Sequence, residues 1–477
     1  MIGALWCDGV VYAAGSILAR GIALLMLPLY TRVLAPADYG ALDLIVTCGV
    51  LVNLVVPLET AQALARFWNE REAGEPRRRL AGTAWSFALA GYALFALVTL
   101  PLAGPIADAL LGDARHAAAL RAGIAFIAVN GLFLLLQNQF RWELRPRAYA
   151  AVSVLYAVLT PAFVALFAWG LGARLEGVLW AQFVAAALCT GLSLLWLRGT
   201  LSLGLHRADL AEMLRFSLPL VPAGIAVFAS FYVNRLMLNA LATLDDVGQF
   251  GIASRLAGMV TLVLVGIQGA LTPLIYAHHH EPETPARLAR LFEGFVAVAL
   301  VACAAIGLFG RELIATFATA DYARAAPLLI WLAPAALLAQ MYIFAPGIAI
   351  AKKTQWQLAI TAASALLGAA LNGWLIPIAG PMGAALATLA AGALFFGGWL
   401  IASQKLYPLP LRGGALLAAT ALFVLVALAV PRLDVALGTG PMAWAAKLAL
   451  LAVIAVAMFP LGLLQIQSLK QLFARAA

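Results

Sequence analysis

The stretch RVLAPADYGALDL (32–44) closes one long apolar segment, turns within a few residues, and opens the next. Its turn contains Pro, Asp and Gly, whereas the flanking segments, near 10–34 and 41–65, carry few charges. Similar segments recur along all 477 residues, of which 64% are hydrophobic and 11% are charged. Soluble domains are about 45–50% apolar and about 25% charged. The composition therefore excludes a soluble enzyme and indicates a membrane protein.

The apolar segments are long enough to cross a bilayer as helices. A spanning helix needs about 20 mostly apolar residues, and we expect about 14 such helices joined by short loops. The predicted spans are 10–34, 41–65, 81–104, 119–140, 148–170, 176–197, 216–241, 248–272, 292–313, 325–350, 357–377, 383–404, 414–430 and 442–464. We therefore expect an all-α polytopic membrane protein in which no loop is large enough for a soluble catalytic domain.

The distribution of the 30 lysines and arginines predicts the orientation of the chain. Nineteen of the 30 lie in alternate loops and the C-terminal tail, and seven lie in the intervening loops. Because cytoplasmic loops are enriched in Lys and Arg, we expect both termini in the cytoplasm. The net charge of +9 is then a sign of topology and of contact with anionic lipids, not of nucleic-acid binding. Four cations lie inside predicted spans: Arg20, Arg235, Arg255 and Lys447.

A second stretch, ALATLDDVGQFGI (240–252), echoes the first one. When Gly40 is set against Gly248, Asp38 falls on Asp246, and each stretch joins two spans through an outer turn. The offset corresponds to six spans, an even number, so the two halves have the same orientation, as in transporters built from parallel repeats. We expect two six-helix lobes and a C-terminal helix pair with a tail, over residues 1–205, 206–405 and 406–477.

Two regions resemble a known family. LPLYTRVLAPADYGALDLIVT (27–47) is similar to the start of the oligosaccharide flippases of the multidrug/oligosaccharidyl-lipid/polysaccharide exporter superfamily, which typically have Pro, an aliphatic residue, Thr-Arg, a turn and Tyr-Gly. Residues 217–256 resemble the helix 7–8 region of that family, with its Leu-Pro-aliphatic-Pro, Asp-Arg and Gly-Tyr. This chain departs from the pattern twice, with Asn234 in place of the Asp and Gln249-Phe250 after the Gly. The Asn puts in doubt any role that needs a carboxylate at that position.

The resemblance implies a flippase that carries an undecaprenyl-pyrophosphate-linked oligosaccharide to the outer leaflet of the bacterial inner membrane by alternating access. Such a protein takes part in cell-surface polysaccharide synthesis, including that of the lipopolysaccharide O-antigen. It is not an enzyme and needs no cofactor, although coupling to H⁺ or Na⁺ stays open. Its partners are the lipid-linked oligosaccharide, membrane lipids, and the polysaccharide polymerase and export machinery.

Two alternatives stay open. A cation-coupled multidrug exporter of the same superfamily would favour buried carboxylates, whereas the charges inside these spans are mostly cationic. A membrane polysaccharide polymerase or ligase would carry a large outer loop, whereas the predicted outer loops are short.

Three of the cations inside predicted spans are candidates for binding pyrophosphate. A charge at the bilayer centre costs roughly 2.5–3.5 kcal/mol and needs a partner or a water-filled cavity. Because a guanidinium donates bidentately to phosphate oxygens, we expect Arg20, Arg235 and Arg255 to line one lumen. The structural alternatives are a pair of Arg20 with Glu59 or Asn53, and an Arg235 that extends to the membrane surface.

Further polar side chains are candidates for contacts with the sugar or with a coupling ion: Asn53, Glu59, Asn234 and Gln268. Amides inside membrane helices more often bridge neighbouring helices. We expect Asp43 to lie near the outer face in water, and Lys447 to extend to the membrane surface.

The sequence predicts no metal site and no hydrolytic site. His278, His279 and His280 precede Glu281 and Glu283, but consecutive histidines cannot all face one ion. No P-loop and no HExxH motif is present, so neither ATP hydrolysis nor zinc-dependent hydrolysis is expected.

Overall fold

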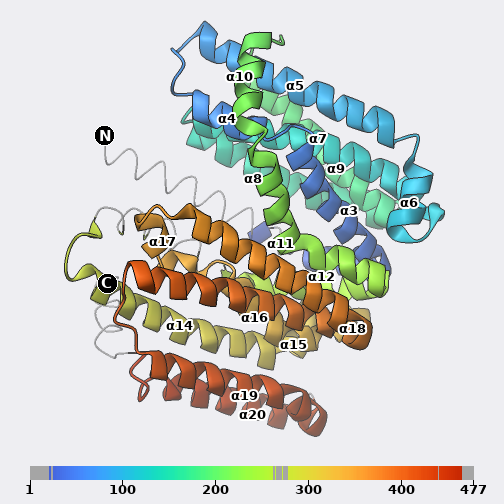
Figure 1. Cartoon of the computed structure of the whole chain (residues 1–477). Helices are drawn as coiled ribbons and strands as arrows, with labels where there is room; N and C mark the ends of the chain where they lie inside the picture. The colour runs from blue at the N-terminus through green and yellow to red at the C-terminus, as the bar shows by residue number, and fades with distance from the viewer. Residues whose placement is uncertain are drawn as a thin grey trace. The chain divides into compact units, whose positions relative to one another are not determined.

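The computed structural model describes residues 21–22, 25–202, 204–261, 264, 271, 275, 278–438 and 440–464. In this part of the chain every regular element is a helix, and nine helices are long and apolar enough to cross a membrane. The helices coincide, wholly or in part, with each of the predicted spans (Figure 1). The predicted all-α polytopic class is therefore confirmed.

The described residues of Met1–Gly248 form one compact unit. A 3-10 turn (Ala114–His116) precedes α7, and a π-helical turn (Ala165–Gly170) extends α8. The α-helices of this unit are α2 (Leu27–Val33), α3 (Pro36–Val55), α4 (Thr60–Phe67), α5 (Glu75–Thr99), α6 (Ala103–Leu111), α7 (Ala117–Trp142), α8 (Pro146–Val164), α9 (Arg174–Leu197), α10 (Arg207–Ser217), α11 (Leu220–Leu241) and the beginning of α12 (Leu244–Ala257).

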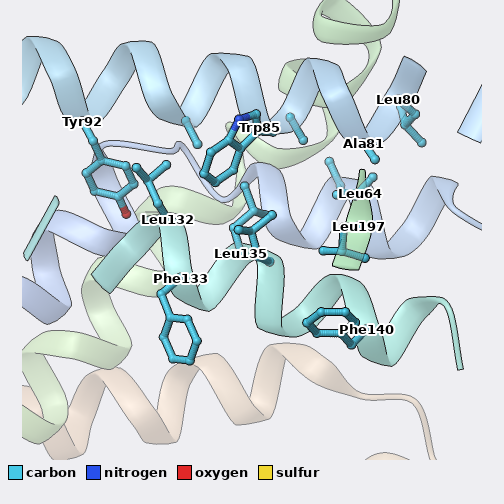
Figure 2. Close-up of a cluster of buried hydrophobic side chains, with 14 of the residues drawn as sticks. Leu64, Leu80, Ala81, Trp85, Tyr92, Leu132, Phe133, Leu135, Phe140 and Leu197 are labelled. Atoms are coloured by element: carbon cyan, nitrogen blue, oxygen red, sulfur yellow. The ribbon is translucent and has the colours of Figure 1, made fainter. Parts of the chain in front are cut away.

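The core of the first unit lies between α5, α7 and their neighbours. Ala81, Trp85, Ala88 and Tyr92 recur every three or four residues, so they share one face of α5. Figure 2 shows Trp85 and Tyr92 projecting from α5 toward Leu132 of α7. Small and large side chains alternate on this face, which allows the close van der Waals packing that holds membrane helices together.

The described residues of Gln249–Ala477 form a second compact unit. Figure 1 shows α19 and α20 side by side, and both pack against α14. Besides the end of α12, the α-helices are α14 (Thr284–Leu308), α15 (Gly310–Phe317), α16 (Leu329–Leu338), α17 (Gly347–Ile350), α18 (Thr354–Leu406), α19 (Gly413–Leu437) and α20 (Pro441–Ala457). Short 3-10 segments cover Gly258–Thr261, Ala320–Leu328 and Met341–Phe344.

The long element α18 contains two helices that meet at Gly380. The backbone of Gly380 has φ 52° and ψ −130°, a conformation that glycine adopts far more readily than other residues. Ser364 donates a hydrogen bond to the carbonyl of Ala391 at 2.6 Å, and Ile360 lies against Gly398. From one pair to the other the residue number rises on the first helix and falls on the second. The chain therefore reverses direction at Gly380, as the two predicted spans on either side of it require.

The predicted span 325–350 is interrupted in the structure. After α16 the chain passes through an irregular stretch before α17, and α18 satisfies its backbone. Trp399 Nε1 donates to the carbonyl of Ala345 at 3.0 Å, and the backbone N–H of Gly347 donates to Ser403 Oγ at 2.8 Å. Irregular backbone at membrane depth is tolerated where protein groups satisfy it.

A further helix, α10, lies where only a loop and the start of a span were predicted. Its residue Asp209 is buried and accepts a hydrogen bond from Arg79 Nε at 3.0 Å. Arg71 lies 3.5 Å from the same carboxylate and also pairs with Glu212. Part of the positive charge between the end of α4 and the start of α5 is therefore neutralised by α10.

The two glycines matched by the sequence repeat lie against each other's helices. A Cβ on Gly40 would fall 2.0 Å from the carbonyl oxygen of Leu244, and a Cβ on Gly248 would fall 1.9 Å from that of Pro36. Gly40 thus lies against the residue four positions before Gly248, and Gly248 lies against the residue four positions before Gly40. Reciprocal contacts of this kind are typical of a two-fold relation, and the parallel repeat stays a prediction.

An ion pair of Lys447 and hydrogen bonds of Arg412 hold the C-terminal helix pair within the second unit. Lys447 Nζ lies 2.8 and 3.0 Å from the carboxylate oxygens of Glu312, and only 3% of the Lys447 side chain is exposed. Glu293 accepts a hydrogen bond from the backbone of Arg412 at 2.7 Å, and Arg412 Nη1 donates to the carbonyl of Gly462 at 2.9 Å. The expectation that Lys447 extends to the membrane surface is therefore wrong, because an acid on α15 holds it inside.

The boundary of the two compact units falls at Gly248, and α10 and α11 belong to the first one. The predicted lobes begin and end elsewhere, because they were drawn from the repeat. The division into residues 1–205, 206–405 and 406–477 stays a prediction.

We expect Gly40→Ala to lower the stability of the folded protein. The new methyl group would fall on a backbone oxygen that has no rotamer to change, and overpacking of this kind costs about 1–3 kcal/mol. The thermal unfolding midpoint in detergent measures the loss. Gly191→Ala in α9 is the matched control, because its Cβ would meet no described atom within 4 Å. Equal losses in both variants would contradict the close contact.

We expect Lys447→Met to destabilise the protein by about 3–5 kcal/mol, because it leaves the largely buried Glu312, 16% exposed, without its ammonium partner. The double variant Lys447→Met/Glu312→Leu removes both charges and should regain most of this loss. Thermal unfolding of the single and double variants measures the difference. A double variant no more stable than Lys447→Met would show that the pairing is not what Lys447 contributes.

Candidate functional site

A buried ion pair joins α3 and α11 in the first unit. Arg235 Nε donates to Asp43 Oδ2 at 2.7 Å, and the two side chains are 15% and 6% exposed. The guanidinium also lies 5.6 Å from the centre of the Tyr232 ring. Such a charge-assisted hydrogen bond is strong away from water. One of the three arginines predicted to bind pyrophosphate is thus held by a carboxylate on another helix.

The helices α3 and α11 pack in opposite directions along much of their length. Asp43 pairs with Arg235 near the start of α3, whereas Leu54, near its end, lies against Gly224. The increasing residue number on one helix therefore matches a decreasing number on the other. The ion pair is one contact in a continuous helix–helix interface.

Burial varies along α3 and α11. Tyr39 and Leu44 on α3 and Leu238 on α11 are fully buried. Toward the end of α3, Val50 is 37% exposed, whereas Phe228 of α11 is only 7% exposed. The ion pair therefore has buried residues of α11 on both sides of it.

The structure corrects the expectation for Asp43. We expected it in water near the outer face, but it is buried, because α11 and the start of α12 pack against this end of α3. Contacts between helices so distant in sequence are not visible in the local pattern. One sequence signal could have pointed to them: Arg235 lacks the acid that commonly precedes it in the family, so a counter-ion from another helix could have been sought.

Asn234 occupies the position of that missing acid. It is buried, and its Oδ1 accepts a hydrogen bond from the backbone N–H of Arg235 at 2.8 Å. The carboxylate that pairs with this arginine comes from Asp43 on α3 instead. A contact between Asn234 and the sugar or an ion stays a prediction.

Asn53 bridges two helices of the first unit. Tyr92 of α5 donates its hydroxyl hydrogen to Asn53 Oδ1 at 2.9 Å. This is the bridging role that amides often have in membrane helices. A contact with substrate stays a prediction for this residue.

Glu59 lies in a break between α3 and α4. Leu58 and Glu59 have positive φ angles of 50° and 56°, so the predicted span 41–65 is two helices rather than one. Glu59 is half-buried, and its Oε1 lies 3.2 Å from the position of a Cβ on Gly224. The carboxylate is thus close to α11, and its role toward sugar or ion stays a prediction.

The remaining predicted site residues are placed only in part. Arg255 is half-buried on α12, among the residues of the second unit. Arg20 and Gln268 lie outside the described residues, as does any pairing of Arg20 with Glu59 or Asn53. The structure brings Arg235 together with Asp43, and a lumen shared by the three arginines stays a prediction.

Within the described residues, no group of three or more His, Cys, Asp or Glu side chains is placed to hold a metal ion. In the segment with three consecutive histidines, His278 Nδ1 lies 2.7 Å from Glu281 Oε1. We centre the candidate site on the Asp43–Arg235 pair.

The helical arrangement is similar to solved structures of transport proteins. It matches the lipid II flippase MurJ in an inward closed conformation with a TM-score of 0.68 and 11% identity, over 94% of this chain and 98% of that chain. It matches an inward-facing multidrug resistance MATE family transporter of the MOP superfamily with a TM-score of 0.66 and 17% identity, over 81% and 95% of the two chains. A MOP superfamily transporter from Pyrococcus furiosus gives 0.55 and 15%, over 84% and 96%. The fold therefore defines the class as polytopic membrane proteins with the MOP-transporter fold.

The family is defined by the sequence. Residues 5–279, more than half of the chain, match the family described as polysaccharide biosynthesis protein. The chain belongs to this family, which confirms the resemblance drawn from residues 27–47 and 217–256. Comparison with curated proteins finds no match.

We expect the effects of Asn53→Ala and Tyr92→Phe on the free energy of unfolding to be non-additive. Either substitution alone removes the hydrogen bond between the two residues. The loss of stability in the double variant should therefore be smaller than the sum of the two single losses by about 0.6 kcal/mol, and by no more than about 1.7 kcal/mol. Thermal or denaturant unfolding of the four proteins measures the coupling. Tyr92→Phe combined with Thr99→Val is the matched control, because the Thr99 hydroxyl bonds to Phe95 on its own helix. Additive losses in the Asn53 cycle would contradict the bridge.

Proposed function

We propose that this protein carries an undecaprenyl-pyrophosphate-linked oligosaccharide from the cytoplasmic to the outer leaflet of the bacterial inner membrane. The observation that carries the proposal is the match of residues 5–279 to the polysaccharide biosynthesis family, on a chain with the MOP-transporter fold. The described helices are joined by short connections, so chemistry on the substrate would have to occur inside the membrane. We infer a transporter rather than an enzyme, which serves cell-surface polysaccharide synthesis such as that of the lipopolysaccharide O-antigen.

The proposed recognition is between guanidinium groups and pyrophosphate. A buried arginine can donate two parallel hydrogen bonds to phosphate oxygens, and the ligand's charge compensates its own. Arg235 supports this role because it is mostly buried and already binds an oxyanion, the Asp43 carboxylate. Arg20 and Arg255 would complete the cation set. Further groups would contact sugar hydroxyls or a coupling H⁺ or Na⁺: Asn53, Glu59, Asn234 and Gln268.

The proposed transport cycle is alternating access between two lobes. Residues 1–205 and 206–405 would move relative to each other, with residues 406–477 as an added helix pair and tail. The excess of Lys and Arg in alternate loops supports cytoplasmic termini. The partners are membrane lipids and the polymerase and export machinery that uses the carried unit.

A cation-coupled multidrug exporter is the second candidate function. It is favoured by the similarity of the fold to a multidrug resistance MATE family transporter and by the buried carboxylate of Asp43. In that case the carboxylate would bind the coupling ion, and the transported molecule would carry no pyrophosphate.

A leaflet-transfer assay in reconstituted vesicles tests the proposal. We expect the purified protein to move a fluorescent undecaprenyl-pyrophosphate-linked sugar across the bilayer faster than protein-free vesicles do. Arg255→Ala should slow transfer by about tenfold or more, because a hydrogen bond to a charged group is worth about 1.5–3 kcal/mol. Arg432→Ala, which changes an exposed arginine, is the matched control.

The outcomes separate the two candidate functions. Transfer no faster than in empty vesicles, together with ion-driven export of a cationic dye, would replace the flippase proposal with the exporter. Loss of transfer in Arg255→Ala that only follows a loss of folded protein would assign Arg255 a structural role.

A further inference from the structure

The ion pair between Asp43 and Arg235 joins α3 to α11 at 2.7 Å. Buried residues of α11 lie on both sides of it, Leu238 at 0% exposure and Phe228 at 7%. Gly40, which packs against the start of α12, is only three residues from Asp43 on α3. The same turn of α3 therefore carries both the ion pair and the close backbone contact.

Arg235 is the more exposed partner of this pair. Its side chain is 15% exposed and that of Asp43 is 6% exposed. An approaching anion would therefore reach the guanidinium before it could reach the carboxylate. The helix face leading to Arg235 carries Phe228 and Tyr232, whose rings are stacked with centres 5.2 Å apart.

Arg235 can leave Asp43 at little cost only if another anion takes the place of the carboxylate. Removing one member of a buried ion pair is strongly destabilising, because the other member stays charged in a poorly hydrated place. A pyrophosphate can replace a carboxylate as the partner of a guanidinium, because it carries more negative charge and offers oxygens for bidentate hydrogen bonds. Thermal motion alone supplies no replacement anion, so we expect the two charges to stay together in the absence of ligand.

We propose that the Asp43 carboxylate is the resident counter-ion of Arg235, and that the pyrophosphate of the substrate displaces it and so releases α11 from α3. Asp43 is then a positioning residue: it acts on the substrate through Arg235. This inference rests on the proposed function, because it takes the lipid pyrophosphate as the displacing anion. It links arrival of the substrate to separation of α11, with its fully buried Leu238, from α3.

A buried reporter on α11 tests the release. Leu238→Cys is introduced into a protein whose four cysteines are replaced by serine or alanine, in phosphatidylcholine nanodiscs, and its reaction with a water-soluble maleimide is measured. Leu179→Cys on α9, equally buried and outside this interface, is the control position. Both should react slowly without ligand.

Removal of the counter-ion should open the interface without any ligand. We expect Asp43→Leu to raise the labelling rate at position 238 by at least about tenfold and to leave position 179 unchanged. The exchanged pair Asp43→Arg/Arg235→Asp restores opposite charges and should return the rate toward that of the parent. Asp43→Glu, which keeps the charge, should label as slowly as the parent and shows that the site tolerates substitution. A parent-like rate in Asp43→Leu overturns the inference.

Labelling in the presence of different ligands identifies the displacing anion. Undecaprenyl pyrophosphate should raise labelling at position 238 in the parent and add nothing in Asp43→Leu. Undecaprenol, which lacks the phosphates, should have no effect. Inorganic pyrophosphate and phosphatidylglycerol distinguish a free anion or an ordinary anionic lipid from the proposed carrier lipid. A response to undecaprenol equal to that of undecaprenyl pyrophosphate overturns the displacement.

The two proposals fail separately. If the parent transfers the lipid-linked sugar but undecaprenyl pyrophosphate leaves labelling unchanged, the displacement of Asp43 is wrong and the flippase function stands. If labelling responds to undecaprenyl pyrophosphate but vesicles show no transfer, the displacement stands and the flippase function is wrong.

Discussion

Charge inside an apolar interior is tolerated only where an opposite charge meets it, and this requirement decides which helices of the protein are neighbours. Asp43 and Arg235 join α3 to α11, and Glu312 and Lys447 join α15 to α20. Each pair connects segments more than a hundred residues apart in the sequence. In an environment where apolar side chains gain little from leaving lipid for protein, such pairs specify partners that packing alone specifies weakly.

For a carrier of an anionic substrate, the same requirement links stability to binding. A binding cation cannot wait unpaired in the membrane, so it must have an internal anion that the substrate can replace. We propose that Asp43 is this anion for Arg235, from which it accepts a hydrogen bond at 2.7 Å. A site of this kind is stable without substrate, because an internal carboxylate occupies the place beside the cation that the anion of the substrate would take.

The sequence was informative where the pattern is local. Apolar length predicted the spans, the break between two spans predicted the reversal at Gly380, and the matched turns drew attention to Gly40 and Gly248, which lie in close contact. Intramembrane position alone identified Arg235 as a candidate. Each of these inferences needs only a window of residues or a comparison of two windows.

Sequence reasoning was wrong or silent where distant segments decide. Asp43 is buried because α11 and α12 cover it, and Lys447 stays inside because Glu312 meets it. The helix α10 owes its position to the contact of Asp209 with Arg71 and Arg79. The spacing of apolar residues records none of these contacts, because each depends on how two separate segments approach.

The reciprocal glycine contact has a consequence for how the chain can change over time. At Gly40 and Gly248 the obstacle to any larger residue is a carbonyl oxygen of the opposite helix, and a main-chain atom is the same for every amino acid. A substitution on one side therefore cannot be rescued by trimming a side chain on the other. At this crossing each helix therefore holds the other to glycine, whatever side chains surround the contact.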